Sequence, residues 1–466
     1  MAQSPLAARS LGLKLLAVGF IVILLAVPLL FVSILSWERA GRADEVRAEV
    51  GEAYGGPQLV RGPFLVLPVQ IETPVEIRED GQTRTEIRRS TEHIILSADQ
   101  LQVDIAQAST LRRRAIYDVP VFDAAIQMEG RFALPPLGNL TPQYGTIDWS
   151  GAEIVFAISD LRGIGEDLVF ETGMGQRLRF EPQTVFDRLS PHAVIDSNNA
   201  GDAQAGRWQG VAAGLDRLAP EAGFDFTASL QLSGADLLLV AASGRETQVS
   251  LQSDWPHPSF LGAYLPQTRD ISDGGHAASW QVPYLARGVP GVWRQSQFDI
   301  RNVDRTAFGV RLFSPADGYT NVGRSLKYAI FFIGFLMLMF FLIEAATRDR
   351  IHAAQYLLIG VTQVIFYLLL LAFSEHMATF TAYLTASAAT ITLTALYAAA
   401  AFKNRTKGMA VFGVLSVIYA MQYALVLLED YALLMGAVLA FLAMAITMYV
   451  TRRLDWYALG PATAKT

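Results

Sequence analysis

The sequence predicts a membrane protein with six transmembrane helices and both termini inside, plus a large β-rich domain outside the membrane. The chain of 466 residues is 52% hydrophobic and only 17% charged, with a mean hydropathy of +0.31. An ordinary soluble protein has roughly 25% charged residues. The apolar residues gather in long uncharged runs near the two ends of the chain. Short strand-like segments fill the region between these runs, and we expect them to form an elongated β-sandwich.

The first apolar run covers residues 15–35. About 20 helical residues span the roughly 30 Å hydrocarbon core of a bilayer, so this run is long enough to cross it. Arg9 and Lys14 precede the run, and Trp37 follows at interface depth. The small-residue cleavage site of a signal peptide is missing after it. Residues 1–36 are therefore expected to be an uncleaved signal anchor.

Five further apolar runs follow near the C-terminus, separated by short loops. They cover residues 328–343, 353–373, 378–402, 408–428 and 431–450. Soluble cores do not contain five such runs in close succession, because each is long enough to cross a bilayer. Residues 328–466 are expected to form a five-helix transmembrane bundle with a short cytoplasmic tail.

Lysine and arginine in the short loops predict the orientation of the helices. With the N-terminus inside, the short outer loops 374–377 and 429–430 hold no basic residue, and ten basic residues lie inside. These are Arg9, Lys14, Arg348, Arg350, Lys403, Arg405, Lys407, Arg452, Arg453 and Lys465. The opposite orientation would reverse this bias, so both termini are predicted to be cytoplasmic.

Residues 37–327 are then outside the membrane. Residues 38–54 are rich in Ala, Glu and Arg, with Glu38 and Arg42 at i,i+4, and predict a helical stalk. A charged linker is the alternative. Two strand-like runs, 63–77 and 83–96, flank Asp80-Gly81, which predicts a β-hairpin. Further strands are expected at 103–106, 116–122, 126–134, 153–158, 168–170, 224–232, 247–251, 296–300 and 308–313.

Catalytic and metal-binding motifs are missing from the sequence. The chain has no cysteine, which excludes disulfides and thiolate chemistry, and its six histidines lack metal-ligand spacing. Asp254, His257 and His276 are near one another in sequence but form no diagnostic pattern. No phosphate-binding loop or hydrolase elbow is present, and a net charge of −6 argues against nucleic-acid binding. We expect no catalytic residue, cofactor or metal, and no enzyme activity.

Ionisable residues at the ends of the predicted spans are candidates for function. Glu375 and His376 end one span, and Glu429 and Asp430 form a whole outer turn. If these ends meet, they form an acidic patch that could bind a divalent cation or a cationic group. The alternative is that short loops are polar because they contact water and lipid headgroups.

Three more candidates lie at the inner side. Glu344 precedes Arg348 by one helical turn, so a local ion pair is expected. His352 and Gln355, at i,i+3, share one helix face and are expected to cap helix packing. The span centres carry no charge, but Gln363 and Gln422 are polar. The alternative function is a transporter or lipid-handling protein that uses the helix bundle and the outer acidic patch, and it requires a groove that reaches the midplane near one of these glutamines.

Several strings resemble the CreD family of bacterial inner-membrane proteins, described as cell-envelope integrity proteins. They are GRSLKYAIFFIGF at 323–335, HAAQYLLIGV at 352–361, FSEH at 373–376, EDYALLMG at 429–436, TRRLDWY at 451–457, RGPFLVLPV at 61–69 and SFLGAYLP at 259–266. Their order and the length of the chain agree with that family, so the resemblance covers nearly the whole chain.

The resemblance implies an inner-membrane protein of a Gram-negative bacterium with a periplasmic domain. It implies a role in envelope stress, linked to a two-component sensory system, and it supplies no reaction and no catalytic residues. Envelope proteins or a sensor kinase system are the expected partners beside the lipid bilayer. The motif residues that are candidates for functional or packing roles are Glu344, His352, Gln355, Glu375, His376, Glu429, Asp430, Arg452, Arg453, Asp455 and Trp456.

Overall fold

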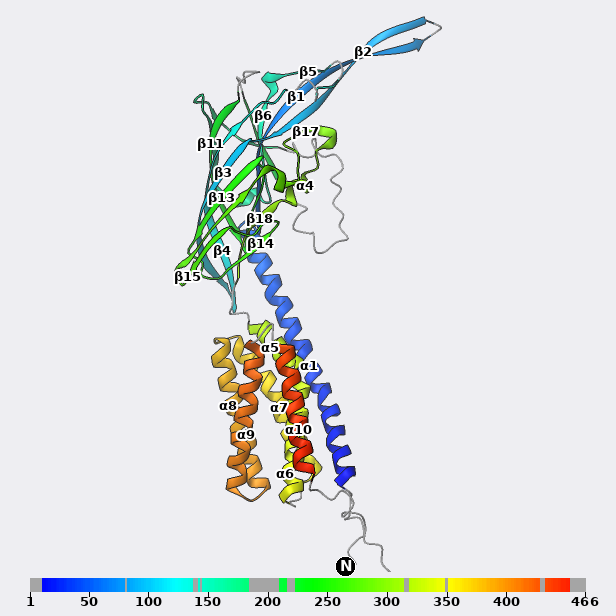
Figure 1. Ribbon diagram of the computed structural model, residues 1–466, viewed down its shortest axis with the longest axis vertical. Coiled ribbons are helices and arrows are strands. Elements are labelled where there is room, and N and C mark those ends of the chain that lie inside the picture. The colour runs from blue at the N-terminus through cyan, green and yellow to red at the C-terminus, as the bar shows by residue number, and fades with distance from the viewer. Residues whose placement is uncertain are drawn as a thin grey trace, which may run out of the picture. The chain divides into compact units, whose positions relative to one another are not determined.

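The computed structural model describes residues 11–79, 82–136, 141–142, 145–183, 209–215, 223–313, 318–347, 351–427 and 432–452. The chain divides into two compact units. One is β-rich and covers Glu45–Pro315, and the other is helical and combines Met1–Asp44 with Ala316–Thr466. Figure 1 traces the elements of both units.

Two sheets form the β-rich unit. In pairing order the first sheet has β14 (Pro258–Gly262), β18 (Ala307–Leu312), β12 (Leu237–Ala241), β1 (Gln58–Glu79), β6 (Glu153–Ile158), β10 (Gln209–Gly214) and β9 (Glu181–Gln183). Three more strands join it off this path: β2 (Gln82–Ser97) and β5 (Gly145–Ile147) pair with β1, and β17 (Val292–Arg294) pairs with β2. The second sheet has β15 (Thr268–Ser272), β16 (Gly275–Val282), β13 (Glu246–Ser253), β3 (Gln100–Arg114), β4 (Tyr117–Phe132), β11 (Phe224–Ala235), β7 (Ile164–Thr172) and β8 (Arg177–Leu178).

The alternation of side chains along the strands builds a core that both sheets share. Leu101, Val103 and Ile105 of β3 are buried, whereas Gln102, between the first two, is exposed on the other face. This is the period of two that a half-buried strand requires. Apolar residues of β1, β2 and β6 in the first sheet belong to the same cluster.

The predicted hairpin is confirmed by the pairing of β1 and β2. Their register runs antiparallel from Phe64↔Ser97 to Glu79↔Gln82. Asp80 and Gly81, the predicted turn, lie outside the described residues. The third partner at this end, β5, pairs with β1 only as far as Ile71↔Gly145. Beyond that point the hairpin extends from the body of the β-rich unit as a two-stranded arm (Figure 1).

Three strand predictions need correction. The predicted strands 116–122 and 126–134 belong to one continuous strand, β4, which begins at Tyr117 and ends at Phe132. The strand predicted at 296–300 is wrong, because this segment contains a 3-10 turn, η4 (Gln295–Gln297), and the start of α4 (Ile300–Asp304). The Asp299 carboxylate accepts a hydrogen bond from the Arg301 backbone N–H at 2.9 Å and thereby caps α4. The other short helices of the unit are η2 (Trp149–Gly151), η3 (Leu161–Gly163) and α3 (Tyr284–Arg287).

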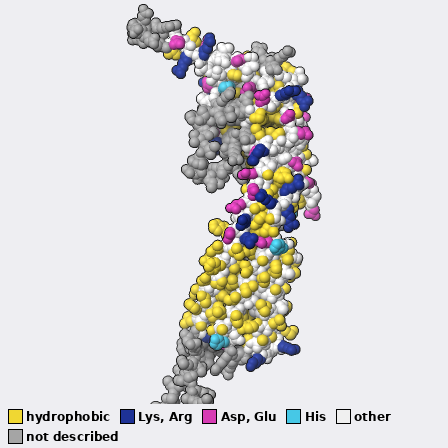
Figure 2. Space-filling view, turned by 180° about the vertical axis from the view of Figure 1, so that it is seen from behind, with side chains coloured by type: hydrophobic (Ala, Val, Ile, Leu, Met, Phe, Trp, Pro, Cys, Tyr) yellow, Lys and Arg dark blue, Asp and Glu magenta, His cyan; other side chains and the backbone are white. Residues whose placement is uncertain are grey.

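Seven helices occur in the described residues outside these short ones. They are α1 (Leu11–Ala53), α5 (Gly318–Lys327), α6 (Ala329–Thr347), α7 (Ala353–Ser374), α8 (Thr379–Ala401), α9 (Arg405–Leu427) and α10 (Ala432–Thr451). By length and composition, four of them can cross a membrane: α1, α7, α8 and α9. The pair α5 and α6, bent by 50°, adds a fifth if it forms one span. Hydrophobic side chains cover most of the visible face of the helical unit in Figure 2.

Candidate functional site

Glu344 is the most buried of the candidate residues, at 7% exposure. Its carboxylate forms an ion pair with Lys14 of α1. It also accepts hydrogen bonds from the Ile351 backbone N–H at 3.1 Å and from the Tyr356 hydroxyl at 2.8 Å. Arg348, the predicted partner, lies outside the described residues. Glu344 therefore joins α1, α6 and α7 at one end of the helical unit, by contacts that neutralise a buried charge.

His352 and Gln355 form a capping box at the start of α7. The His352 Nδ1 accepts from the Ala354 backbone N–H at 3.2 Å, and the Gln355 side-chain oxygen accepts from the His352 backbone N–H at 2.9 Å. Such reciprocal bonds satisfy backbone donors that have no partner within the helix. The pair thus fixes where α7 begins, which accounts for both side chains without a ligand.

Glu375 lies at the other end of α7, where it contacts two other helices. It accepts a hydrogen bond from the Tyr319 hydroxyl of α5 at 3.1 Å, and its carboxylate lies 3.6 Å from the guanidinium of Arg39 in α1. The neighbouring His376 is exposed. Glu429 and Asp430 lie outside the described residues, so their predicted meeting with Glu375 stays a prediction. Within the described ranges, no group of three His, Cys, Asp or Glu side chains is placed to hold a metal.

The C-terminal motif is described only at its start. The Arg452 guanidinium lies over the Tyr449 ring, 3.9 Å from its centroid, in cation–π geometry. Arg453, Asp455 and Trp456 lie outside the described residues.

The two glutamines of the span centres belong to a hydrogen-bond network between helices. Gln422 donates to the Ser325 hydroxyl at 3.0 Å and to the Tyr367 hydroxyl at 2.8 Å. Gln363 accepts from the Tyr419 hydroxyl at 2.7 Å. The spacing of these residues in the sequence indicates that they share helix faces. Gln363 and Tyr367 lie at i,i+4 on α7, and Tyr419 and Gln422 lie at i,i+3 on α9.

Both glutamines are buried, at 5% and 2% exposure, and both side-chain atoms of Gln363 and the amide nitrogen of Gln422 have partners within the helices. Interhelical hydrogen bonds of this kind hold membrane helices together where lipid gives no hydrophobic driving force between them. The network therefore connects α5, α7, α8 and α9.

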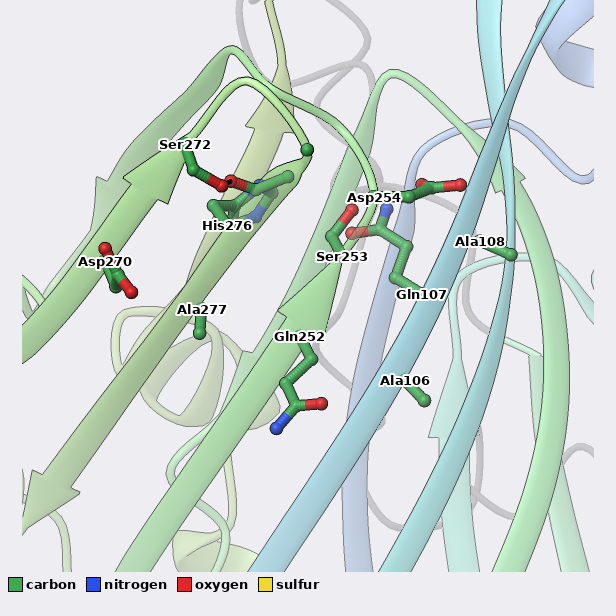
Figure 3. A pocket seen from close by; sticks show the side chains of 12 residues that line it. Ala106, Gln107, Ala108, Gln252, Ser253, Asp254, Asp270, Ser272, His276 and Ala277 are labelled. Carbon is green, nitrogen blue, oxygen red and sulfur yellow. Dashed lines mark hydrogen bonds between the residues drawn. The ribbon is translucent and has the colours of Figure 1, made fainter.

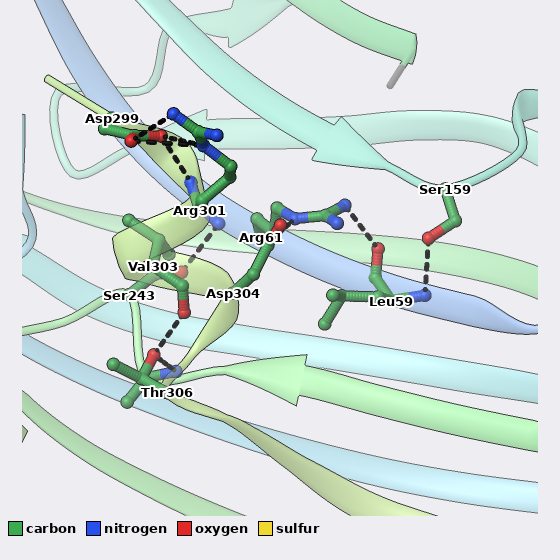
Figure 4. A network of polar contacts seen from close by, with 11 residues as sticks. Leu59, Arg61, Ser159, Ser243, Asp299, Arg301, Val303, Asp304 and Thr306 are labelled. Atoms are coloured by element: carbon green, nitrogen blue, oxygen red, sulfur yellow. Dashed lines mark hydrogen bonds and ion pairs between the residues drawn. The ribbon is translucent and has the colours of Figure 1, made fainter. Parts of the chain in front are cut away.

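The β-rich unit contains a buried ion pair, Arg61 with Asp304 (Figure 4). Arg61 of β1 is 1% exposed, and it also donates to the Leu59 carbonyl at 3.4 Å. Burial raises the pKa of Asp304, and the positive charge of Arg61 opposes that rise. A second buried cation, Arg287, donates to backbone carbonyls of Gly244 and Pro290, each at 2.8 Å. Burial lowers the pKa of Arg287 to about 10, so it still carries its charge at neutral pH.

These observations define a class of protein. Helices long and apolar enough to cross a membrane occur with a β-rich unit that has its own hydrophobic core. The chain is therefore a multi-pass membrane protein with a large β-rich domain.

Comparison with known proteins gives the family. The model of the family described as inner membrane protein CreD matches residues 10–457. The inner membrane protein CreD of Escherichia coli (strain K12) is 33% identical over 438 residues, which covers 94% of this chain and 92% of that protein. The chain belongs to the CreD family of inner-membrane proteins, as its motifs predicted.

A solved structure was also found, that of a putative protease from Parabacteroides distasonis ATCC 8503. It is 11% identical, covers 53% of this chain and 51% of its own, and has a TM-score of 0.23. A similarity at this level supports no conclusion about fold or activity.

Proposed function

We propose that this protein supports the integrity of the cell envelope and its response to stress, without catalysing a reaction. The architecture carries the proposal. More than half of the chain, Glu45–Pro315, forms a β-rich unit with its own core, attached to apolar helices. Membership of the CreD family also supports a role in the cell envelope. The unit is suited to contact envelope proteins or a sensor kinase system.

In this proposal six helices cross the inner membrane, with α5 and α6 as one span and α10 as another. Both termini are cytoplasmic, and the β-rich unit lies in the periplasm as an elongated sandwich of the two sheets. The bias of basic residues toward one side supports this orientation, because lysine and arginine stay on the cytoplasmic side of short loops.

The absence of cysteine from the sequence makes the topology simple to test. Thr227→Cys places one thiol on an exposed position of β11, and Thr406→Cys places one at an exposed position near the start of α9. A membrane-impermeant maleimide added to spheroplasts should label the first and not the second, and permeabilised cells should label both. Labelling of Thr406→Cys alone in intact spheroplasts would overturn the orientation.

The functional test is a deletion strain complemented by the intact chain. Loss of the protein should raise dye entry and sensitivity to envelope-active agents, and the full-length gene should restore both to normal. Unchanged permeability and sensitivity in the deletion strain would overturn the proposal.

The alternative is a transporter or lipid-handling protein that uses the helix bundle. The hydrogen bonds of Gln363 and Gln422 favour a packing role over a groove at these positions. The Gln422→Leu variant separates the two functions. A folded variant that complements fully supports the envelope role, whereas a folded variant that fails supports transport.

A further inference from the structure

The outer face of the second sheet has a polar stripe along β13, with the carboxylate of Asp104 on β3 beside Ser250. Gln248, Ser250 and Gln252 alternate with buried residues and point outward from this strand. Their cross-strand neighbours on β3 and β16 share that face, as in the row Gln102–Gln248–Gln281. We call these three residues and their neighbours on β3 and β16 the polar lane. A shallow pocket of about 180 Å³ is lined by the row just named, together with Ser250.

A larger pocket, of about 550 Å³, lies at the end of the polar lane (Figure 3). It forms where β13 ends at Ser253 while β3 continues to Arg114. In the described part of this sheet, no strand then separates β3 from the turn between β15 and β16. Residues of the outward row, such as Gln252, and of the next, inward row, such as Gln107, therefore line one pocket.

Two residues that line this pocket have buried polar atoms without partners. Gln107 and His276 are only 4% and 5% exposed. Both amide atoms of Gln107 and the Nε2 of His276 have no hydrogen-bond partner among the described residues. The His276 Nδ1 lies 2.7 Å from the Trp255 carbonyl oxygen, which can only accept, so Nδ1 holds the proton and Nε2 of the neutral ring is an acceptor. Buried polar groups without partners are costly, and a bound hydrogen-bonding molecule would satisfy them.

The lining chemistry indicates what that molecule is. Amides, hydroxyls and the carboxylates of Asp104, Asp254 and Asp270 contribute hydrogen-bonding atoms, most of them acceptors, and neither lysine nor arginine lines either pocket. An anionic ligand would therefore meet no neutralising charge. Acceptors in excess suit a ligand that carries many hydroxyl donors. The small side chains of Ala106 and Ala277 leave room for the C–H face of a sugar ring on the floor of the larger pocket.

We propose that the polar lane and the pocket at its end bind an uncharged, hydroxyl-rich glycan strand. From Gln248 to Gln252 the lane runs for roughly 14 Å at the rise of a β-strand, which is longer than one sugar ring. The site therefore takes an oligosaccharide segment. The inference depends on the proposed function only for the source of the glycan, which would be the periplasmic side of the envelope.

The test is calorimetric titration of the full-length protein in nanodiscs. The probes are chitohexaose and cellohexaose, with hexagalacturonate as an anionic comparison. Saturable binding of at least one uncharged hexamer is expected. The double variant Gln248→Ala/Gln252→Ala should weaken it by about tenfold or more, because two hydrogen-bonding amides are lost. Gln231→Ala, on the same face but on β11 and outside both pockets, should not change it. These three sites are exposed, so the variants fold.

Three results would overturn the proposal: no saturable binding of either uncharged hexamer, an unchanged affinity in the double variant, or tighter binding of hexagalacturonate. A second variant, Gln107→Met, removes the unpaired amide at similar volume. Its melting temperature without ligand should equal or exceed that of the wild type, and the rise on adding the uncharged hexamer should shrink. A variant that melts lower and keeps the full ligand-dependent rise would give Gln107 a structural role and remove it from the site.

This test and the test of the proposed function fail separately. Glycan binding by the purified protein together with an unaltered deletion strain would keep this inference and overturn the envelope role. An altered envelope in the deletion strain without glycan binding by the purified protein would keep the envelope role and overturn this inference.

Discussion

At the scale of single residues, Glu344 shows how a charge is kept within an apolar helix. A buried carboxylate is costly unless a counterion and hydrogen bonds compensate for lost water. Lys14, Tyr356 and the Ile351 backbone supply these contacts. The sequence pattern suggested Arg348, four positions away, because helical spacing reveals only local partners. Lys14 lies 330 positions from Glu344 in the chain, and no periodicity could predict that contact.

Replacing Glu344 by glutamine should destabilise the helical unit, because Lys14 then keeps a partly buried charge without its counterion. Loss of one partner of a buried pair costs roughly 3–5 kcal/mol, but the Lys14 side chain is 29% exposed, so about 1–3 kcal/mol is expected. The double variant Lys14→Met/Glu344→Gln should recover part of the loss. Thermal unfolding of the wild type, Lys14→Met, Glu344→Gln and the double variant measures the coupling between the two side chains. Lys327→Met, at an exposed lysine, serves as control. Additive effects of the two substitutions would contradict the pairing.

His276 should make the stability of the β-rich unit depend on pH. Burial lowers its pKa below the ordinary value of 6.5, and the Trp255 carbonyl and Asp254 oppose this shift. The folded state therefore binds fewer protons than the unfolded state below about pH 6.5. Its contribution to stability is complete above that pH and is lost as the pH falls through the lowered pKa, by at most about 1.4 kcal/mol per pH unit.

Urea unfolding followed by tryptophan fluorescence between pH 7.5 and pH 5 measures this dependence. His276→Gln removes the titrating group, so its midpoint should fall less over this range than that of the wild type. His257→Gln, at an exposed histidine, should behave like the wild type. An identical decline in all three proteins would assign the pH dependence to other groups.

At the scale of helices, the network around Gln422 should hold α5, α7 and α9 together. Gln422→Leu leaves the hydroxyls of Ser325 and Tyr367 buried without their donor partner, which costs about 1–3 kcal/mol. Adding Tyr367→Phe should restore part of the stability, because fewer polar groups are then unpaired. Unfolding in detergent measures both variants, and Ser416→Ala, at a half-buried position of α9 whose hydroxyl bonds only to its own helix, is the matched control. A Gln422→Leu protein as stable as the control would show that the network contributes nothing.

The segment 296–300 shows why one strand prediction failed. Phe298 and Ile300 are buried and Asp299 is not, which is the alternation of a strand. The Asp299 side chain, however, bonds to the Arg301 backbone and starts a helix. Short polar side chains can thus redirect a backbone whose apolar pattern fits a strand. The β1–β2 hairpin was predictable because its strands and its turn signal are adjacent in the sequence.

At the scale of the whole molecule, composition and apolar runs were sufficient to predict a membrane protein with a separate β-rich part. The strand order was beyond such reasoning. β1 pairs in parallel with β12, and β3 pairs in parallel with β13. Parallel partners need long crossover connections and leave no turn signal between them. For the same reason the sequence did not place Gln107 beside Ser253, its neighbour in the larger pocket.

The two units should unfold in separate transitions, because each has its own core. Five of the seven tryptophans, among them Trp280 and Trp293, lie within Glu45–Pro315, so fluorescence mainly follows the β-rich unit. In detergent, urea should change the fluorescence at a lower concentration than it removes the far-UV helix signal, because micelles protect the helices. Coincident midpoints would contradict independent unfolding.

The two-stranded arm formed by β1 and β2 gives the β-rich unit reach. From Ile71, the last residue of β1 that pairs with β5, to Glu79, the strand advances by roughly 27 Å at the rise of a β-strand. An unsupported hairpin of this kind has little apolar surface to bury, and its order depends on cross-strand bonds alone. The arm can therefore contact a partner that the rest of the two sheets does not reach. Such a partner would stiffen the arm by pairing with the free edges of its two strands.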